Sequence, residues 1–289
     1  MPNLPFMHSK QWLLAAGGIL LTLSLFYFGR IRYREGAAAE GSQAVRDKPN
    51  AGATGMSFPT LLQLAGTTLK ADEKKNVEAL DARLAATGTP SDSVPVLFQL
   101  SRTWLNTGNF IVAGSYYEMQ ARITRQKAWW DTAAQVLSYG FHNTTDSLAR
   151  IYGVNHTLTC YEMLRKMDPE NIDYKIGYAT TLIDGRDDVM TGVGLLREVD
   201  AVHPDNIQVN LILGRLNIRN GQYDKSIERL QKVITLDPDN LGAYLYLADC
   251  YSAMGRKDKA IVALQQARSV SHDEQMNAEI DKSIKELSN

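Results

Sequence analysis

The chain has 289 residues, with 31 Lys and Arg against 32 Asp and Glu, which gives a formal net charge of −1. This balance argues against a nucleic-acid-binding protein, because such a protein needs a basic surface that displaces counterions from phosphates. The two cysteines, Cys160 and Cys250, are too few for a disulfide framework. Both fall in helical patterns, where Cys usually acts as a small buried apolar residue.

The first predicted element is a membrane-spanning helix over residues 11–29, which carry no charge across 19 positions. As a helix this segment is about 28 Å long, close to the roughly 30 Å of a bilayer's hydrocarbon core. Arg30, Arg32 and Arg34 follow it and separate it from the small residues at 37–39. We therefore predict an uncleaved single-pass anchor over residues 1–34 rather than a cleaved secretory signal.

The basic residues that follow the anchor outnumber those before it, so the positive-inside rule favours a cytoplasmic position for the rest of the chain. The periplasmic side stays open, because long domains can cross a membrane despite a modest charge bias. The fold style and the anchor suggest the inner membrane of a bacterium. Residues 35–57 are rich in Gly, Ala, Ser and Asn and lack aromatic residues, which predicts a flexible linker.

Apolar residues at helical spacing resume at Phe58 and predict two helices in 58–93, which we interpret as an N-terminal cap. At the other end, Met276, Ile280 and Ile284 share one face of a helix predicted in 271–289. Its opposite face is charged, which suits a C-terminal cap on an array of repeats.

Residues 94–270 contain an internal repeat. Pro204 and Pro238 lie 34 residues apart, and Gly221 and Gly255 have the same separation. This period is typical of a helix-turn-helix solenoid. The glycines suit a turn at positive φ between two helices, and Gly108 stands at the same place in an earlier unit. Asp224 and Asp258 follow as predicted N-caps of the second helix.

One position of the repeat is small in all five predicted units, because the two helices of a unit approach closely there and a larger side chain would force them apart. A second position is small for the same reason, and a third carries the bulk that fills the gap. The first set is Ser101, Ala134, Ala179, Gly214 and Ala248; the second is Ala113, Gly192, Ser226 and Ala260; the third is Tyr117, Tyr161, Leu196, Leu230 and Leu264. The second unit is irregular, with an elongated second helix predicted over 146–167.

This pattern resembles the tetratricopeptide repeat (TPR) family, whose units pair a helix A with a helix B. The resemblance implies an all-α, right-handed TPR solenoid and a scaffold that binds proteins or peptides in a concave groove lined by helices A. The groove residues that it implies are Phe98, Arg102, Asn106, Gln135, Tyr139, Gln208, Leu211, Arg215, Arg219, Leu245 and Asp249, together with Asp173, Ile176, Thr180, Asp184 and Ser252. The carboxylate clamp of TPR co-chaperones is absent, because Phe98 with Arg102, and Leu211 with Arg215, replace its Lys and Asn.

We predict no catalytic, cofactor or metal site and no small-molecule substrate. His156 and Cys160 are one helical turn apart, but no second pair of ligands has metal-site spacing. The leading hypothesis is a membrane-anchored scaffold and not an enzyme. Two alternatives stay open. One is an envelope-facing assembly factor of the cytochrome or outer-membrane type, and the other is an enzyme with a site in the irregular second unit, near His142, His156 and Cys160.

Overall fold

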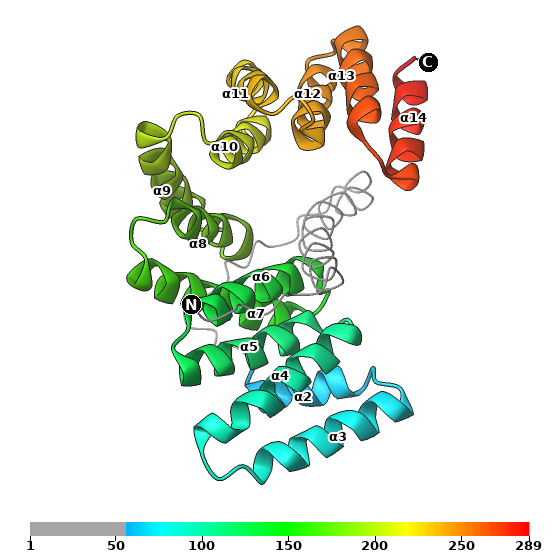
Figure 1. The fold of residues 1–289 in the computed structure, drawn as a ribbon. Coiled ribbons are helices and arrows are strands. Elements are labelled where there is room, and N and C mark those ends of the chain that lie inside the picture. The colour runs from blue at the N-terminus through cyan, green and yellow to red at the C-terminus, as the bar shows by residue number, and fades with distance from the viewer. Residues whose placement is uncertain (1–55, 289) are drawn as a thin grey trace, which may run out of the picture. The chain divides into compact units, whose positions relative to one another are not determined.

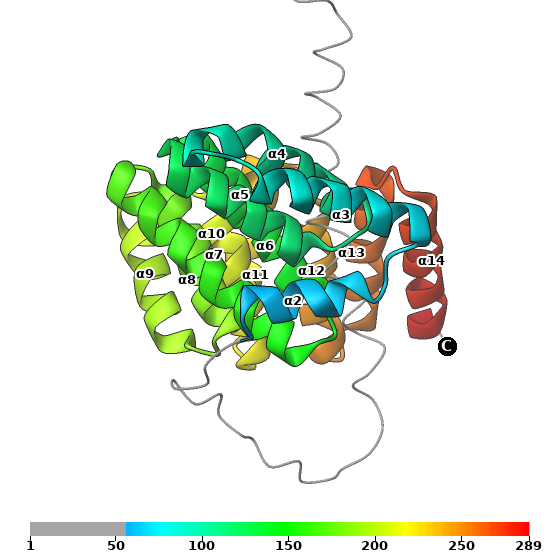
Figure 2. The same cartoon turned by 90° about the horizontal axis from the view of Figure 1, so that it is seen from below.

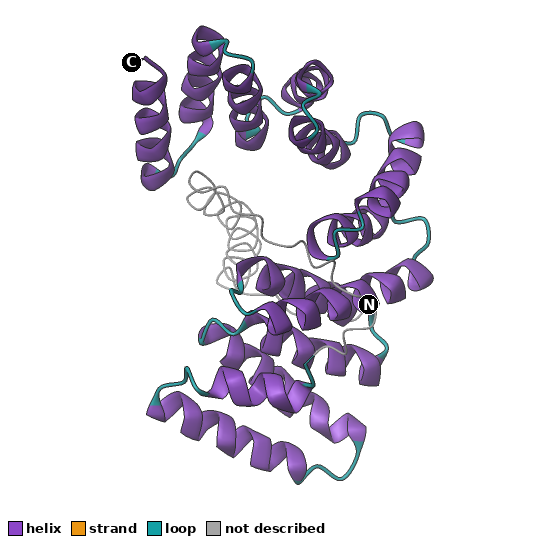
Figure 3. Ribbon diagram, turned by 180° about the vertical axis from the view of Figure 1, so that it is seen from behind, coloured by secondary structure: helices purple, strands orange, loops and turns teal. Residues whose placement is uncertain are grey.

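The computed structural model describes residues 56–288, and every regular element among them is an α-helix (Figure 3). The chain forms two compact units, the first ending at Pro169 and the second beginning at Glu170. The predicted anchor over 11–29 lies outside the described residues. No helix within residues 56–288 combines the length and the apolar character that crossing a membrane requires.

The first unit is built from two helical hairpins with two further helices packed against them (Figure 1). The helix α4 packs on α5 and α6 packs on α7, while α5 also packs on α6. Of the preceding helices, α3 packs along α4 and α2 lies against α5. The bounds are α2 (Phe58–Gly66), α3 (Ala71–Ala85), α4 (Pro90–Asn106), α5 (Phe110–Thr124), α6 (Lys127–Asn143) and α7 (Ser147–Met167).

The second unit contains three hairpins followed by a last helix that lies alongside α13 (Figure 2). The hairpins pair α8 with α9, α10 with α11, and α12 with α13. Met276 and Ile280 of the last helix are buried, as the apolar face predicted for it requires. The bounds are α8 (Ile172–Gly185), α9 (Val189–Val202), α10 (Ile207–Arg219), α11 (Tyr223–Leu236), α12 (Leu241–Ala253), α13 (Lys257–Val270) and α14 (Glu274–Ser288).

The small residues predicted where helices A and B cross are buried in all five hairpins, which confirms the register of the repeat. Gly192 of α9 shows why the position must be small. A Cβ atom there would lie 2.5 Å from Cγ1 of Ile183 and 2.7 Å from the carbonyl oxygen of Ala179. The helices α8 and α9 could not keep this separation around a larger residue.

The three turn glycines adopt the predicted left-handed backbone conformation. Their φ angles are +78° at Gly108, +71° at Gly221 and +70° at Gly255. In all three turns the next residue donates its amide hydrogen back to the end of helix A. The donors are Asn109, Gln222 and Arg256, and the acceptors are the carbonyls of Trp104, Asn217 and Tyr251. These bonds close helix A and start helix B at once.

The start of helix B differs from the prediction at Asp224 and Asp258, which are not N-caps. The caps of α11 and α13 are Gln222 and Arg256, and neither makes a side-chain capping bond. Helix B begins directly after the glycine turn, so both aspartates fall within its first helical turn. Their carboxylates there still oppose the positive end of the helix dipole.

The irregular second hairpin contains the elongated helix that the sequence predicts. The helix α7 has 21 residues, and its N-cap Asp146 accepts a hydrogen bond from the amide of Ala149 at 2.7 Å. Tyr161, predicted to fill the gap between helices, is only half-buried, whereas Leu164 is fully buried. The extra length of α7 therefore shifts the bulky position away from where the repeat template puts it.

Candidate functional site

An aromatic patch lies on the first unit and consists of Phe98, Arg102, Tyr117 and Trp129. The ring of Trp129 stacks on Tyr117 at 5.9 Å and meets Phe98 edge-on at 5.8 Å. The guanidinium of Arg102 lies over the Phe98 ring, 5.9 Å from its centroid. Phe98 stays 36% exposed and Trp129 is half-buried, so part of this aromatic surface faces solvent. Helices α4, α5 and α6 each supply part of the patch.

Three other predicted groove residues of the first unit lie on the same two helices as Phe98 and Trp129. Asn106 is exposed at the end of α4. Gln135 is exposed on α6 and donates from Nε2 to a carboxylate oxygen of Asp131 at 3.0 Å. Tyr139 is half-buried, with its ring edge-on to Phe110 at 4.4 Å.

In the second unit, Arg215 is tied to a neighbouring repeat. Its Nη2 atom donates to both carboxylate oxygens of Asp184, at 2.8 and 2.9 Å. The two side chains are 21% and 10% exposed. The Nε atom of Arg215 is buried without a hydrogen-bond partner among the described residues. Arg215 therefore joins α10 to α8, with only part of its guanidinium open to a ligand.

The remaining predicted residues of the second unit divide by exposure. Gln208 and Arg219 are exposed on α10, whereas Leu211, Leu245 and Asp249 are half-buried. Ile176 and Thr180, which the resemblance also assigned to the groove, are buried. Ile176 belongs to the apolar core that α8 shares with α9 and α10, so the expectation for this residue was wrong.

The period of 34 returns as a repeated contact in the second unit. The side-chain amide of Asn210 donates to the carbonyl of Pro204 at 2.8 Å. One period later, the hydroxyl of Tyr244 donates to the carbonyl of Pro238 at 3.0 Å. In both hairpins, helix A thus holds the loop that precedes it through the same position, whatever the residue there.

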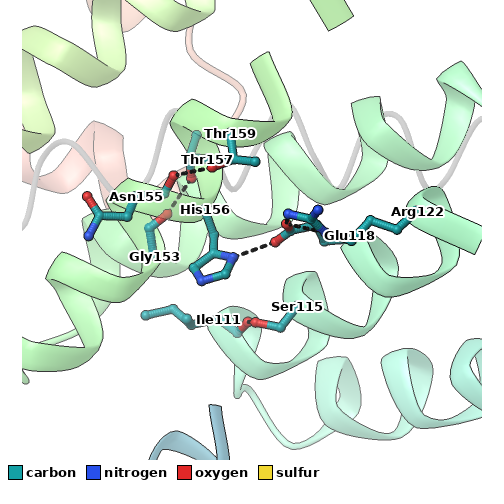
Figure 4. Close-up of polar contacts among 9 residues, drawn as sticks. All are labelled: Ile111, Ser115, Glu118, Arg122, Gly153, Asn155, His156, Thr157 and Thr159. Carbon is teal, nitrogen blue, oxygen red and sulfur yellow. Dashed lines mark hydrogen bonds and ion pairs between the residues drawn. The ribbon is translucent and has the colours of Figure 1, made fainter. Parts of the chain in front are cut away.

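A buried carboxylate of α5 joins that helix to α7 of the irregular hairpin (Figure 4). Glu118 is 3% exposed and lies 2.6 Å from Nδ1 of His156. Arg122 also donates to it, from Nε at 3.0 Å and from Nη2. Burial raises the pKa of Glu118, but His156 and Arg122 together outweigh burial and leave the pKa below its ordinary value. Glu118 is therefore a charged tie between helices.

The enzymatic alternative also names Cys160 and His142. The Cys160 thiol is buried, and burial followed by the charge of Glu118 raises its pKa well above the ordinary value, so it is a poor nucleophile. His142 pairs through Nδ1 with the carbonyl of Ser138 at 2.7 Å. Glu118 therefore acts on both His156 and Cys160, whereas His142 contacts the backbone of its own helix.

Tandem helical hairpins, with close A–B crossings and exposed polar or aromatic side chains on helix A, define a helical-repeat protein. In a comparison with family models, residues 218–278 match a model described as "Tetratricopeptide repeat". The matched segment runs from the end of α10 into α14. A comparison with curated proteins found no match.

Among solved structures, similar folds include a tetratricopeptide repeat protein from Parabacteroides merdae. It is 16% identical, with 80% of this chain and 99% of that chain covered, and its TM-score is 0.46. A MamA fragment from Desulfovibrio magneticus is 18% identical, with coverages of 68% and 98% and a TM-score of 0.43. YrrB, described as a TPR protein with an unusual peptide-binding site, is 13% identical, with coverages of 65% and 91% and a TM-score of 0.38.

Proposed function

We propose that the chain is a TPR scaffold, tethered to the bacterial inner membrane by residues 11–29, that binds a peptide segment of a partner protein in the concave groove lined by helices A. The observation that carries the proposal is the aromatic patch, where Phe98 remains 36% exposed although its own hairpin has a well-packed interior. Aromatic rings beside an arginine are the side chains most enriched at the centres of protein–protein interfaces.

Photo-crosslinking tests the binding face in the intact chain. A photoreactive amino acid at Gln135 or Gln208, exposed on helices A, should crosslink a partner protein in cells. The matched controls are Glu162 and Thr235, which are exposed on helices B. Binding on helices A predicts a discrete adduct from the first pair and none from the second. Adducts from the B-helix positions alone would contradict the proposal.

The tether rests on the uncharged run at 11–29 and the arginines that follow it. The proposed orientation places the repeats in the cytoplasm. Fusions of a cytoplasm-active and a periplasm-active reporter to the C-terminus, in parallel, distinguish this orientation from the envelope-facing alternative. Recovery of the chain in the soluble fraction after cell lysis would count against the tether itself.

A further inference from the structure

We infer that the aromatic patch is selective for a segment that places a bulky apolar side chain next to a carboxylate. This inference rests on the proposed function and specifies the partner. The apolar requirement follows from Phe98 and Trp129, whose partly exposed rings offer surface that an aromatic or aliphatic side chain would cover. The acidic requirement follows from the charges around those rings.

One guanidinium group, that of Arg102, adjoins Phe98, and it has no carboxylate partner within residues 56–288. Arg102 is exposed, and its positive charge also acts on the Tyr117 hydroxyl by lowering its pKa against the larger effect of burial. Arg83 of α3 donates from Nη1 to the side-chain oxygen of Gln99, the residue after Phe98, at 2.9 Å. A guanidinium over an aromatic ring is held extended, with its donors available to a carboxylate.

The guanidinium that already lies over the Phe98 ring disfavours a basic ligand. A basic ligand would meet Arg102 already seated over Phe98, so its cation would find the ring face occupied and the nearby charge repulsive. An acidic residue would gain a charge-assisted pair with Arg102 while its apolar neighbour packs on the rings.

The test uses the full chain in detergent micelles and fluorescein-labelled decapeptides. Each peptide carries a central Phe, Trp or Leu flanked by Asp and Glu, by Asn and Gln, or by Lys and Arg. Anisotropy titration should rank the acidic set tightest, by about tenfold over the amide set, which corresponds to one charge-assisted hydrogen bond. The Arg102→Gln variant should lose that tenfold advantage and leave binding of the amide set unchanged.

Two further variants separate the causes. Phe98→Ala should weaken both the acidic and the amide sets, since both use the rings. Arg197→Gln removes the same charge from an exposed position on α9 and should change neither. Unchanged circular dichroism and thermal unfolding of each variant show that the fold is intact.

The outcomes distinguish this inference from the proposed function. Equal or tighter binding of the amide or basic set overturns the acidic preference and leaves peptide binding standing. A lack of binding by every set, while Gln135 still crosslinks a partner, overturns the role of the patch. A lack of both binding and crosslinking overturns the inference and the proposed function together.

Discussion

Two glycines on α9, two residues apart, should respond in opposite ways to substitution by alanine. At Gly192 the new Cβ atom would lie 2.5 Å from Cγ1 of Ile183 and 2.7 Å from the backbone oxygen of Ala179. Ile183 could change rotamer, but the backbone oxygen cannot move unless α8 moves. At Gly194 a new Cβ atom would meet nothing within 4 Å. Both glycines lie inside the same helix at negative φ.

The magnitudes follow from two opposing terms. Replacing Gly by Ala inside a helix gains about 1 kcal/mol from conformational preference, and this gain is similar at both sites. Overpacking a close helix crossing costs about 1–3 kcal/mol, and only Gly192 incurs it. Gly194→Ala should therefore stabilise the protein, and the two variants should differ by about 1–3 kcal/mol. Because the preference term cancels in this difference, the comparison isolates the packing cost.

Urea unfolding followed by circular dichroism at 222 nm measures both variants under one set of conditions. The urea midpoint of Gly194→Ala should lie above that of the wild type. The midpoint of Gly192→Ala should lie at or below that of the wild type. If Gly192→Ala were as stabilising as Gly194→Ala, the close approach of α8 and α9 would be wrong, and with it the packing that fixes the hairpin.

Three further predictions concern other contacts. Ala248→Leu should cost about 1–3 kcal/mol by overpacking, whereas Ser252→Leu, exposed one turn later, should barely change the urea midpoint; equal effects would mean that the repeat register is misassigned. Arg229→Ala should cost about 1–3 kcal/mol, because Arg229 bonds Asp200 and the buried Asn210, and an unchanged midpoint would refute that role. The lowered pKa of Glu118 means that its charge stabilises the fold above its unfolded pKa of about 4.3, and that this stability is lost as the pH falls through the folded value. Glu118→Gln should flatten that acid limb of a stability–pH curve, and an equally steep limb in the variant would show that other carboxylates cause it.

The hairpins could be predicted from the sequence because their constraints are local and repeat. A helix crossing admits only small residues, so Ala179, Gly214 and Ala248 recur at spacings of 35 and 34 and are all buried. The turn glycines recur for an equally local reason, their positive φ. Such constraints can be recognised in a single sequence because each unit shows the same residue type at the same position.

The contacts between helices of different hairpins could not be predicted in this way. Gly114 and Gly140 show it: a Cβ atom on Gly114 would lie 3.0 Å from the amide nitrogen of Leu137, and one on Gly140 would lie 2.9 Å from that of Ile111. These glycines let α5 and α6 approach backbone to backbone, but they stand outside the repeat pattern. Sequence spacing gives no sign of which helix a glycine faces.

The candidate site shows the same division. Phe98 and Arg102 were both predicted to line the groove on helix A, and the structure brings them together. Trp129 was missed, because it precedes Trp130, which fits the apolar pattern of α6 and is buried. Trp129 belongs to the patch because it contacts Phe98 and Tyr117 of the neighbouring hairpin, which its own helix pattern does not show. Arg215 and Asp184 were both assigned to the groove, but that they pair depends on the packing of α10 against α8.

Comparison of equivalent positions in the second unit shows what the repeat leaves free to vary. Arg229 of α11 binds Asp200 of α9 and so links two hairpins. The residues 34 positions later are Ala263 and Ile234, which cannot form that pair. Ala263 lines a pocket of about 340 Å³ within the α12–α13 hairpin, beside Tyr251 and Val262.

The contacts inside each hairpin behave differently, since the bond from helix A to the preceding proline loop survives the exchange of Asn210 for Tyr244. The repeat therefore keeps this contact of helix A, whereas the ion pair that links α11 to α9 has no counterpart one period later. Binding specificity should reside where the repeat imposes least. In the first unit that place is the predicted groove side of α4, where the repeat tolerates an exposed Phe98 and leaves Arg102 without an acidic partner among the described residues.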